Sequence, residues 1–309
     1  MNHHGLFVKL MQRRVPERLL CVLEHWFAIG STCIKWYSCF IKWYSCFSGA
    51  FCLPCGVRQG GVLSPYLFAI FIDSVFTRVQ SCPFGCTIKW YCMSIFLYAD
   101  DIVLLAPSIC ALQDLLHACE AELAWLDMSL NASKTTSLRI GPRYKHKCCE
   151  LTTMDGHEIP WSNTIRYLGV HLVSSKNFSI SLDYAKKSFY RAFNGMFGKV
   201  GRVASENVVV ELLKIKCLPI LLYGLEACPL TKTQLNSLNY VISSSFRKIF
   251  NVRSNEIVDF CRYMFNCSNI KDILSIRKRK FLQKYCSLEN IVCALCRHQA
   301  DIELASLDT

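Results

Sequence analysis

Two adjacent aspartates, Asp100 and Asp101, are the residues of this chain best suited to metal-dependent chemistry. They separate two short apolar runs, 94–97 and 102–106, whose β-forming residues predict a pair of buried strands joined by a tight turn. Neighbouring carboxylates beside a buried hairpin repel each other unless a cation neutralises them, and Mg²⁺ prefers oxygen ligands. The pattern therefore predicts a metal site at a hairpin tip. An ordinary solvated turn is the alternative, because Asp is common in turns.

A glycine-rich segment, Gly56–Gly61, precedes the aspartates. Glycines allow the backbone to approach a nucleotide or a template strand closely, while Arg58 can meet phosphate and Gln59 can donate hydrogen bonds. The segment leads into a predicted helix with Ser64 as its N-cap and Pro65 in its first turn. Taken alone, it is more typical of a plain loop-to-helix turn.

A lysine and a second β-like segment follow the aspartates. Lys134 comes after a predicted helix over 111–127, a place where an exposed lysine is usually only solvated. The pattern turns β-like over 136–172, with one run at 137–140 and another at 165–172 that contains Tyr167, Leu168 and Gly169. Gly169 would permit a tight turn or a close backbone contact there, and an ordinary sheet edge is the alternative.

Four motifs, Gly56–Phe68, Tyr98–Asp101, Leu130–Thr135 and Tyr167–Val170, resemble in their order the reverse transcriptase domain of non-LTR (LINE-type) retrotransposons. The likeness continues weakly to roughly residue 280. It implies an RNA-directed DNA polymerase, a nucleotidyltransferase in which two metal ions activate the primer 3′ hydroxyl for attack on a dNTP. The implied partners are an RNA template, a DNA primer and dNTPs, and the implied cofactor is Mg²⁺, with Mn²⁺ as a substitute.

The resemblance assigns a role to each matching position. Asp100 and Asp101 would be catalytic and would bind metal. Lys134 would be catalytic by neutralising or protonating the departing pyrophosphate. The positions assigned to nucleotide or template binding are Arg58, Gln59, Gly60 and Tyr98. Those assigned to primer binding are Tyr167, Leu168 and Gly169, in a hairpin that the family uses to hold the primer's end.

One part of the family's site has no counterpart in this sequence. The opening residues 2–10 resemble the segment that follows the first catalytic motif, so the aspartate of that motif would lie before Met1. Asp73, Asp114 and Asp127 fall on predicted helices and do not replace it. We therefore expect a truncated chain with an incomplete metal site and little or no polymerase activity alone. A non-catalytic nucleic-acid-binding remnant is the alternative, and a product that exposes sheet edges and fails to fold is a third.

The composition agrees with a nucleic-acid partner. The 309 residues carry a formal net charge of +12, which favours a polyanion, although a generally basic surface is the alternative. With 52% hydrophobic and 19% charged residues, the chain is predicted to be globular. The 20 cysteines come without a signal sequence or a long apolar run, so we expect reduced thiols, no membrane, and an intracellular location in the nucleus or the cytoplasm. The cysteine pairs at 52/55, 82/86 and 293/296 do not complete a zinc pattern.

The order of the patterns predicts an α+β fold, and the resemblance implies a partial polymerase palm of antiparallel sheet and packed helices followed by an all-α thumb-like domain. The expected parts are a fingers and palm remnant (1–55), a palm core (56–174), a helical thumb-like domain (175–284) and a tail of unknown role (285–309). Within the remnant, Ile34–Phe40 is repeated at once as Ile41–Phe47. A seven-residue insertion would invert the faces of a strand, so the second copy must loop out or form an extra strand. The basic run 276–280 is interpreted as a phosphate grip, a nuclear address or a solvated helix face.

Overall fold

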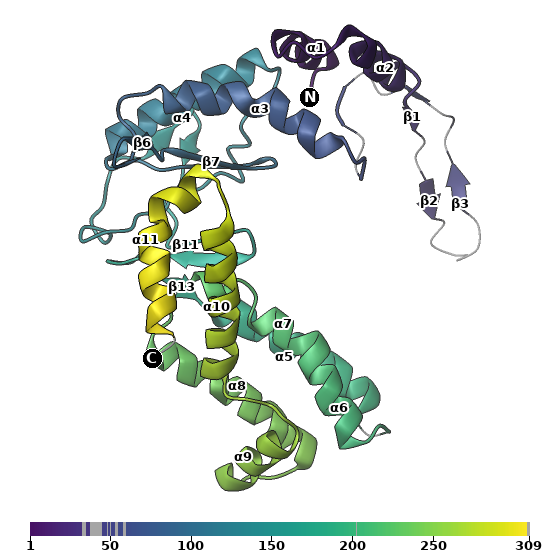
Figure 1. Cartoon of the computed structure of the whole chain (residues 1–309), viewed down its shortest axis with the longest axis vertical. Helices are drawn as coiled ribbons and strands as arrows, with labels where there is room; N and C mark the ends of the chain where they lie inside the picture. Colours follow the sequence, from purple (N-terminus) through teal and green to yellow (C-terminus); the bar gives the residue numbers. More distant parts are fainter. Residues whose placement is uncertain are drawn as a thin grey trace. The chain divides into compact units, whose positions relative to one another are not determined.

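Helices and small antiparallel sheets make up the structure (Figure 1), which confirms the predicted α+β class. The computed structural model describes residues 1–32, 35–37, 45–47, 49, 51–52, 55–57, 60–201 and 203–307. The chain divides into two compact units. Unit 1 comprises Met1–Thr135 and Cys149–Pro160, and unit 2 comprises Thr136–Cys148 and Trp161–Thr309.

Unit 1 combines helices with two-stranded antiparallel ladders. The helices are α1 (His3–Gln12), α2 (Glu17–Ala28), α3 (Ser64–Gln80) and α4 (Ile109–Trp125). The ladders pair β1 (Ser31–Thr32) with β4 (Phe51–Cys52), β2 (Lys35–Tyr37) with β3 (Ser45–Phe47), β5 (Thr87–Ile88) with β6 (Tyr91–Cys92), β7 (Ile95–Tyr98) with β8 (Asp101–Leu104), and β9 (Leu151–Thr152) with β10 (Glu158–Ile159). Strand β2 comes from the first copy of the tandem repeat and β3 from the second, so the second copy supplies an extra strand.

Helix α3 is the centre of the unit 1 core. Leu67, Phe71 and Val75 lie on one face of this helix and are at most 5% exposed. They pack in one cluster with buried side chains of α1, α2, β7 and α4, namely Leu6, Leu10, Leu23, Ile95, Leu115, Cys119 and Leu123. Each buried leucine or phenylalanine contributes about 1.5–3 kcal/mol. The packing of α1 and α4 on α3 therefore supplies much of the stability of unit 1.

The start of α3 differs from the sequence prediction. Leu63, not Ser64, is the N-cap residue, and it makes no side-chain capping bond. Ser64 is the first helical residue and is buried, while Pro65 lies in the first turn as predicted. The prediction of Ser64 as the cap is wrong because the backbone is already helical at Leu63, with φ −84° and ψ −18°.

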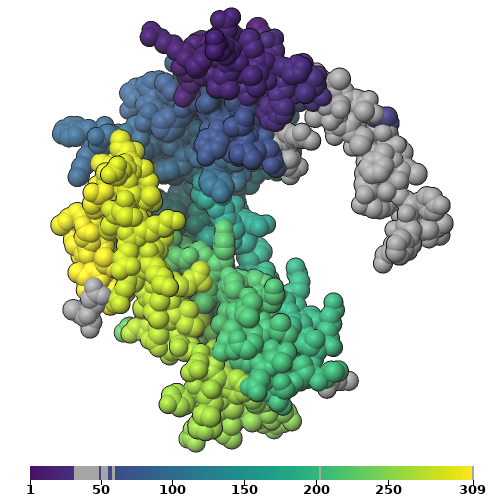
Figure 2. Space-filling view, turned by 45° about the vertical axis from the view of Figure 1, so that its right-hand side comes forward, coloured from purple at the N-terminus to yellow at the C-terminus, as the bar shows by residue number. Residues whose placement is uncertain are grey.

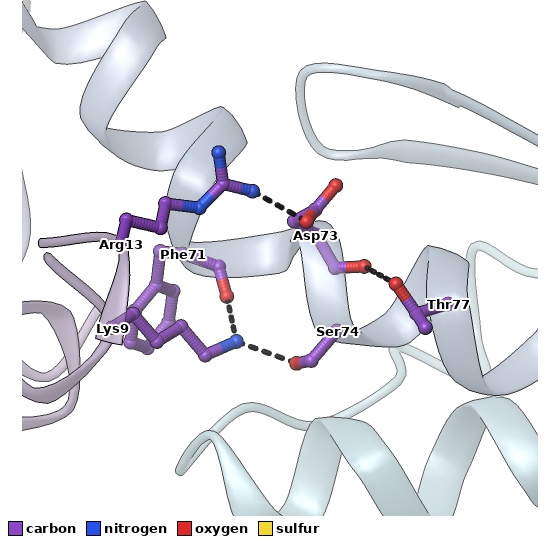
Figure 3. Close-up of polar contacts among 6 residues, drawn as sticks. All are labelled: Lys9, Arg13, Phe71, Asp73, Ser74 and Thr77. Carbon is purple, nitrogen blue, oxygen red and sulfur yellow. Dashed lines mark hydrogen bonds and ion pairs between the residues drawn. The ribbon is translucent and has the colours of Figure 1, made fainter.

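A buried lysine joins α1 to α3 (Figure 3). Lys9 is 6% exposed, and its Nζ donates hydrogen bonds of 2.5 Å to the Phe71 carbonyl and to the Ser74 hydroxyl. One helical turn further along, Arg13 forms an ion pair of 2.5 Å with Asp73 (Figure 3). Burial lowers the pKa of Lys9 from its ordinary value, against the opposing effect of nearby carboxylates.

We expect Lys9→Met to remove a pH dependence of stability. Because the pKa of Lys9 is lower in the folded chain than the ordinary 10.5, the unfolded chain binds more protons between those two pKa values. The free energy of unfolding therefore rises with pH in that window, and this rise should disappear in Lys9→Met. Near pH 7 the variant should differ from the parent by less than about 1 kcal/mol, because an apolar side chain of similar length replaces a buried charge.

Urea melts from pH 7 to 11 would measure this change. The buried thiol of Cys119 has a pKa raised to about 12, so it titrates with the opposite sign. The quantity to compare is therefore the difference in the free energy of unfolding between the parent and Lys9→Met at each pH. Lys89→Met, a change at an exposed lysine, is the control. A rise of equal size in both variants would show that Lys9 is not its source.

Unit 2 has one small sheet followed by helices. Strands β11 (Thr164–Tyr167), β12 (Val170–Val173) and β13 (Ile180–Ser181) form an antiparallel sheet in that order. The helices are α5 (Asp183–Val200), α6 (Glu206–Leu212), α7 (Leu218–Leu221), α8 (Lys232–Phe250), α9 (Asn255–Met264), α10 (Ile270–Ser287) and α11 (Ile291–Ser306). A π-helix, η1 (Leu213–Cys217), joins α6 to α7, and a 3₁₀ turn, η2 (Leu225–Ala227), follows α7.

Two details of unit 2 differ from the sequence prediction, and a third concerns a break between two helices. The last strand ends at residue 181 and not near 175, because Ile180 is buried in the core and pairs with β12. Residues 137–140 form only isolated bridges, to Trp161 and Ser175, where a strand was expected. The helical break lies in η1, before Pro219, because proline lacks an N–H and sits in the first turn of α7.

The unit 2 core lies where α5, α7, α8 and the start of α10 meet. Its fully buried members include Phe189, Phe193, Val210, Leu213, Leu221, Leu238, Ile242, Phe246 and Ile270. Val170 and Leu172 of β12 pack against the same cluster, so the hairpin is attached to the helical core. Helices α10 and α11 run side by side, as the yellow segments of Figures 1 and 2 show.

Candidate functional site

The Asp100 and Asp101 pair lies at the tip of the β7–β8 hairpin in unit 1, as predicted. Tyr98 pairs with Asp101 in antiparallel register, so Ala99 and Asp100 form a two-residue turn. Ala99 has a positive φ of 53°, the sign that a type II′ turn requires at its first central position. The turn therefore presents two adjacent carboxylates at one end of the hairpin.

The two strands are less buried than the sequence predicts. Ile95 is buried, the other apolar residues of the two strands are partly buried, and Tyr98, Asp100 and Asp101 are exposed. The reason is that β7 and β8 form a two-stranded ladder of their own, packed against α3 and α4. Water therefore solvates both carboxylates. Burial does not by itself require a metal there, contrary to the electrostatic expectation from the sequence.

The glycine-rich loop is described only in part. Arg58 and Gln59, which were assigned to nucleotide binding, lie outside the described residues. Gly60 has a φ of +79° and open space where a side chain would stand, so its backbone conformation is what favours glycine. At the start of the loop, the Gly56 N–H donates to the Met1 carbonyl at 2.7 Å, and its own carbonyl lies 2.9 Å from Nε2 of His3. The loop therefore starts from a fixed point beside α1.

Lys134 lies in an exposed turn that Asn131 organises. The Lys134 N–H donates to the Asn131 carbonyl at 3.0 Å and to its Oδ1 at 3.2 Å. The Thr135 hydroxyl donates to the same carbonyl at 2.9 Å. These bonds fix the backbone, and within the part of the chain that the structure describes the Lys134 ammonium group has no partner.

The second predicted hairpin, β11–β12, is present in unit 2. Tyr167 pairs with Val170, so Leu168 and Gly169 form a two-residue turn with φ values of 44° and 84°. Positive φ at both positions is typical of a type I′ turn, whose twist suits a tight hairpin. The tip of the hairpin is therefore formed by two of the residues assigned to primer binding.

Contacts with the helices hold this hairpin in place. His171 of β12 stacks on Tyr184 of α5, with ring centroids 3.8 Å apart and planes inclined by 4°. Burial and the nearby Arg166 guanidinium lower the pKa of His171, so its ring is neutral at pH 7. The β-sheet and the first helix of unit 2 are thus joined by an uncharged aromatic stack.

Tyr223 is a residue at this hairpin that the sequence did not single out. A Cβ at Gly169 would lie 2.8 Å from Cε1 of Tyr223, so the tyrosine ring lies directly against the hairpin tip. At Gly224, a Cβ would lie 3.0 Å from Cγ2 of Val170. The sequence shows only an aromatic residue followed by glycine after an apolar run. Because the contact joins distant segments, no local pattern connects it to Gly169.

With this geometry known, comparison with known proteins decides the family. A family model described as reverse transcriptase (RNA-dependent DNA polymerase) matches residues 1–172, more than half of the 309-residue chain. The chain belongs to the reverse transcriptase family. The match includes the glycine-rich loop, the aspartate pair, Lys134 and the β11–β12 hairpin as far as Leu172.

The relatives of this reverse transcriptase domain are non-LTR retrotransposon polymerases, as predicted. The chain is 29% identical over 208 residues to the Pol polyprotein of a type-1 retrotransposable element R2 of Popillia japonica, covering 64% of this chain and 32% of the relative. It is 27% identical over 206 residues to the RNA-directed DNA polymerase of the mobile element jockey of Drosophila funebris, covering 63% and 22%. A third relative, the Pol polyprotein of the type-2 element R2DM of Drosophila melanogaster, is 30% identical over 127 residues, covering 39% and 12%. The chain thus spans about a third or less of the length of these relatives.

Reverse transcriptases as a family use divalent metal ions, so the fit of the aspartate pair to a metal must be judged from its surroundings. In the described residues, no group of three or more His, Cys, Asp or Glu side chains gathers to hold a metal ion. Asp73 is paired with Arg13, Asp114 lies on α4, and Asp127 accepts a hydrogen bond of 2.5 Å from Asn2. A two-metal centre needs carboxylates from more than one strand. Within the described residues, no third ligand of this kind is therefore placed beside Asp100 and Asp101.

The basic run of α10 lies outside the matched residues and is largely paired within the chain. Arg277 lies 3.2 Å from the Glu226 carboxylate, Lys278 lies 2.9 Å from Glu303, and Arg279 donates to the Leu307 carbonyl at 2.8 Å. Lys280 is exposed and has no partner among the described residues. These contacts favour a role in holding η2, α10 and α11 together over a phosphate grip or a nuclear address.

Two further expectations concern cysteines and membranes. The cysteines whose side chains the structure describes are free thiols. Within the described ranges, no helix has both the length and the apolar character that crossing a bilayer requires.

We expect Ala99→Gly to stabilise unit 1 by about 0.5–1 kcal/mol. An alanine at positive φ is strained, whereas glycine adopts this conformation freely. Ala69→Gly on the exposed face of α3 is the matched control, and it should destabilise the unit by about 1 kcal/mol, because it adds glycine to a helix interior. Urea melts of both variants measure whether the free energy of unfolding rises in Ala99→Gly and falls in Ala69→Gly. Destabilisation by Ala99→Gly would contradict the geometry of the turn.

Proposed function

We propose that the chain is the nucleic-acid-holding portion of a non-LTR reverse transcriptase, and that residues 1–309 alone bind primed RNA template but synthesise little or no DNA. The observation behind this proposal is the aspartate pair at the β7–β8 tip. It lies inside the family match, and no third metal-binding side chain lies near it in the described part of the chain. In-line nucleotidyl transfer needs two bridged metal ions, which this pair does not hold by itself.

We assign a role to each residue that the family resemblance singles out. Asp100 and Asp101 supply carboxylate oxygens to Mg²⁺ or Mn²⁺, and the exposed Lys134 ammonium neutralises phosphate. Arg58, Gln59, Gly60 and Tyr98 contact the template and the dNTP, and Tyr167, Leu168 and Gly169 hold the primer. The exposure of Tyr98, Lys134 and the β11–β12 tip supports these roles, since each is accessible to a nucleic acid.

The parts of the chain are assigned by analogy with polymerases. Residues 1–55 form a fingers and palm remnant, 56–174 the palm core, 175–284 a helical thumb and 285–309 a tail. The hairpins in the second part and the uninterrupted series of helices from α5 onward support this division. A protein with RNA and DNA partners acts in the nucleus or the cytoplasm, and we place the chain there.

Primer extension tests the proposed function. Residues 1–309 are incubated with a primed RNA template, dNTPs and Mg²⁺ or Mn²⁺, and binding to the same template is measured by fluorescence anisotropy. We expect binding without detectable extension. Robust incorporation that vanishes in Asp100→Ala would overturn the claim that the site is incomplete, and absence of binding would overturn the proposed function itself.

A non-catalytic nucleic-acid binder is the second candidate, favoured by the net charge of +12 and the incomplete metal site. The two candidates differ in how binding depends on metal. A polymerase remnant should bind a primed template with dNTP more tightly in Mg²⁺, and Asp100→Ala with Asp101→Ala should abolish that gain. A plain binder should show no such gain. The same double variant measured in EDTA is the control, because without divalent metal ions its change in affinity comes only from the loss of two negative charges.

A further inference from the structure

Tyr223 combines a fixed backbone with an exposed ring beside the β11–β12 hairpin. Its neighbours in sequence, Leu222 and Leu225, are buried in the unit 2 core, which fixes the backbone on either side. Its own side chain is 58% exposed, and its ring lies against Gly169 at the hairpin tip. The ring is therefore held in place on one side and open to a ligand on the other.

The surface around Tyr223 has the chemistry that a nucleotide recognises. Leu168 at the adjoining tip is 38% exposed and extends the apolar surface beside the ring. The Tyr223 hydroxyl has no hydrogen-bond partner among the described residues and is free to bond a sugar or a base edge. Aromatic side chains of this kind stack on bases or sugars whatever the sequence of the nucleic acid.

The nearby charges also suit a polyanion. Glu226, the acidic residue that follows closely in η2, is neutralised by Arg277 at 3.2 Å. Arg166, which pairs with His171 in the hairpin, is exposed. We propose that Tyr223 is a primer-contacting residue, whose ring packs on the sugar and base of the last primer nucleotides beside Leu168. The proposal rests on the proposed function, in which this hairpin holds the primer.

Site-specific fluorescence tests the proposal. One RNA–DNA primer–template carries 2-aminopurine at the primer 3′ end, and another carries it well inside the duplex. The proteins compared are the parent chain, Tyr223→Ala, Tyr223→Phe, and Tyr263→Ala, which removes an aromatic side chain that is 79% exposed on α9. Thermal melts confirm that each variant is folded.

We expect Tyr223→Ala to bind a recessed primer end about tenfold more weakly and to lose the fluorescence change of the terminal probe. The internal probe should respond as it does in the parent, Tyr223→Phe should retain the terminal signal, and Tyr263→Ala should match the parent. A terminal signal that Tyr223→Ala leaves unchanged, or an equal loss in Tyr263→Ala, would overturn the inference. If the parent still bound primed RNA in that case, the proposed function would survive.

Photo-crosslinking of the unaltered chain gives a second measurement that does not depend on the folding of a variant. A 4-thiothymidine at the primer 3′ end should crosslink to the peptide that contains Tyr223, while the same base placed inside the duplex should not. Terminal crosslinks found only elsewhere would overturn the assignment of Tyr223. A parent chain that binds no primed RNA would overturn both this inference and the proposed function.

Discussion

Gly169→Ala should lower the free energy of unfolding of unit 2 by about 3 kcal/mol. Part of the loss comes from the backbone, because φ is +84° and an L residue there costs about 1–2 kcal/mol. The rest comes from packing, because the new Cβ would lie 2.8 Å from Cε1 of Tyr223 and overpacking of this kind costs about 1–3 kcal/mol. Urea melts followed by far-UV circular dichroism measure the loss.

A double variant separates the two causes. In a Tyr223→Ala background the steric conflict is gone, so Gly169→Ala should cost only its backbone share, and the two changes should couple by about 1–2 kcal/mol. Gly156→Ala, in unit 1, is the control for the backbone cost alone, because its φ of +80° is similar and its surroundings are open, and its cost is measured on the unfolding of unit 1. If Gly156→Ala and Gly169→Ala lowered the free energy of unfolding equally, the Tyr223 ring would not lie close enough to the hairpin to clash with a Cβ at position 169.

Raising the salt concentration from 50 to 200 mM should weaken binding to an RNA–DNA duplex by about a thousandfold, if about six phosphates are neutralised. The physical reason is that a chain with a net charge of +12 releases counterions when it binds a polyanion. Anisotropy titrations at several salt concentrations give the slope. If the logarithm of the binding constant hardly changed with the logarithm of the salt concentration, the basic surface would not be the source of the affinity.

Two lysines of α10 provide a matched pair for the same experiment. Lys280→Gln should reduce the salt slope by about one unit if this unpaired side chain meets a phosphate. Lys278→Gln should leave the slope unchanged, because its Nζ lies 2.9 Å from Glu303 of α11. An equal reduction in both variants would show that the pairing with α11 does not hold Lys278 away from the nucleic acid.

Local features of the structure were predictable from the sequence. The helix that follows the glycine-rich loop, helix α4 and the turn between the strands beside the aspartates follow from apolar periodicity and turn residues. Each of these depends on residues a few positions apart, so the pattern that encodes it is visible in the chain. The order of the motifs likewise indicated the reverse transcriptase family, which the family match confirms.

The N-cap of α3 and the burial of β7 and β8 were predicted less well, because the same residues are compatible with more than one local structure. Ser64 is a strong capping residue by type, yet it is the first helical residue, and the N-cap is Leu63, which makes no side-chain capping bond. The strands beside the aspartates are apolar enough to be buried on both sides. Their pairing into a ladder of two strands leaves them partly exposed, because no third strand covers them within the described residues.

By itself the sequence indicated the family and predicted which residues lie at the turn beside Asp100 and Asp101. Only the tertiary structure decided which of those residues and which charges are already engaged within the chain. Arg277 contacts Glu226, which lies 51 positions away in the sequence, and the ring of Tyr223 packs against Gly169 from another segment of unit 2. Such contacts depend on how helices and strands pack together, and a sequence pattern that repeats over a few residues carries no information about them.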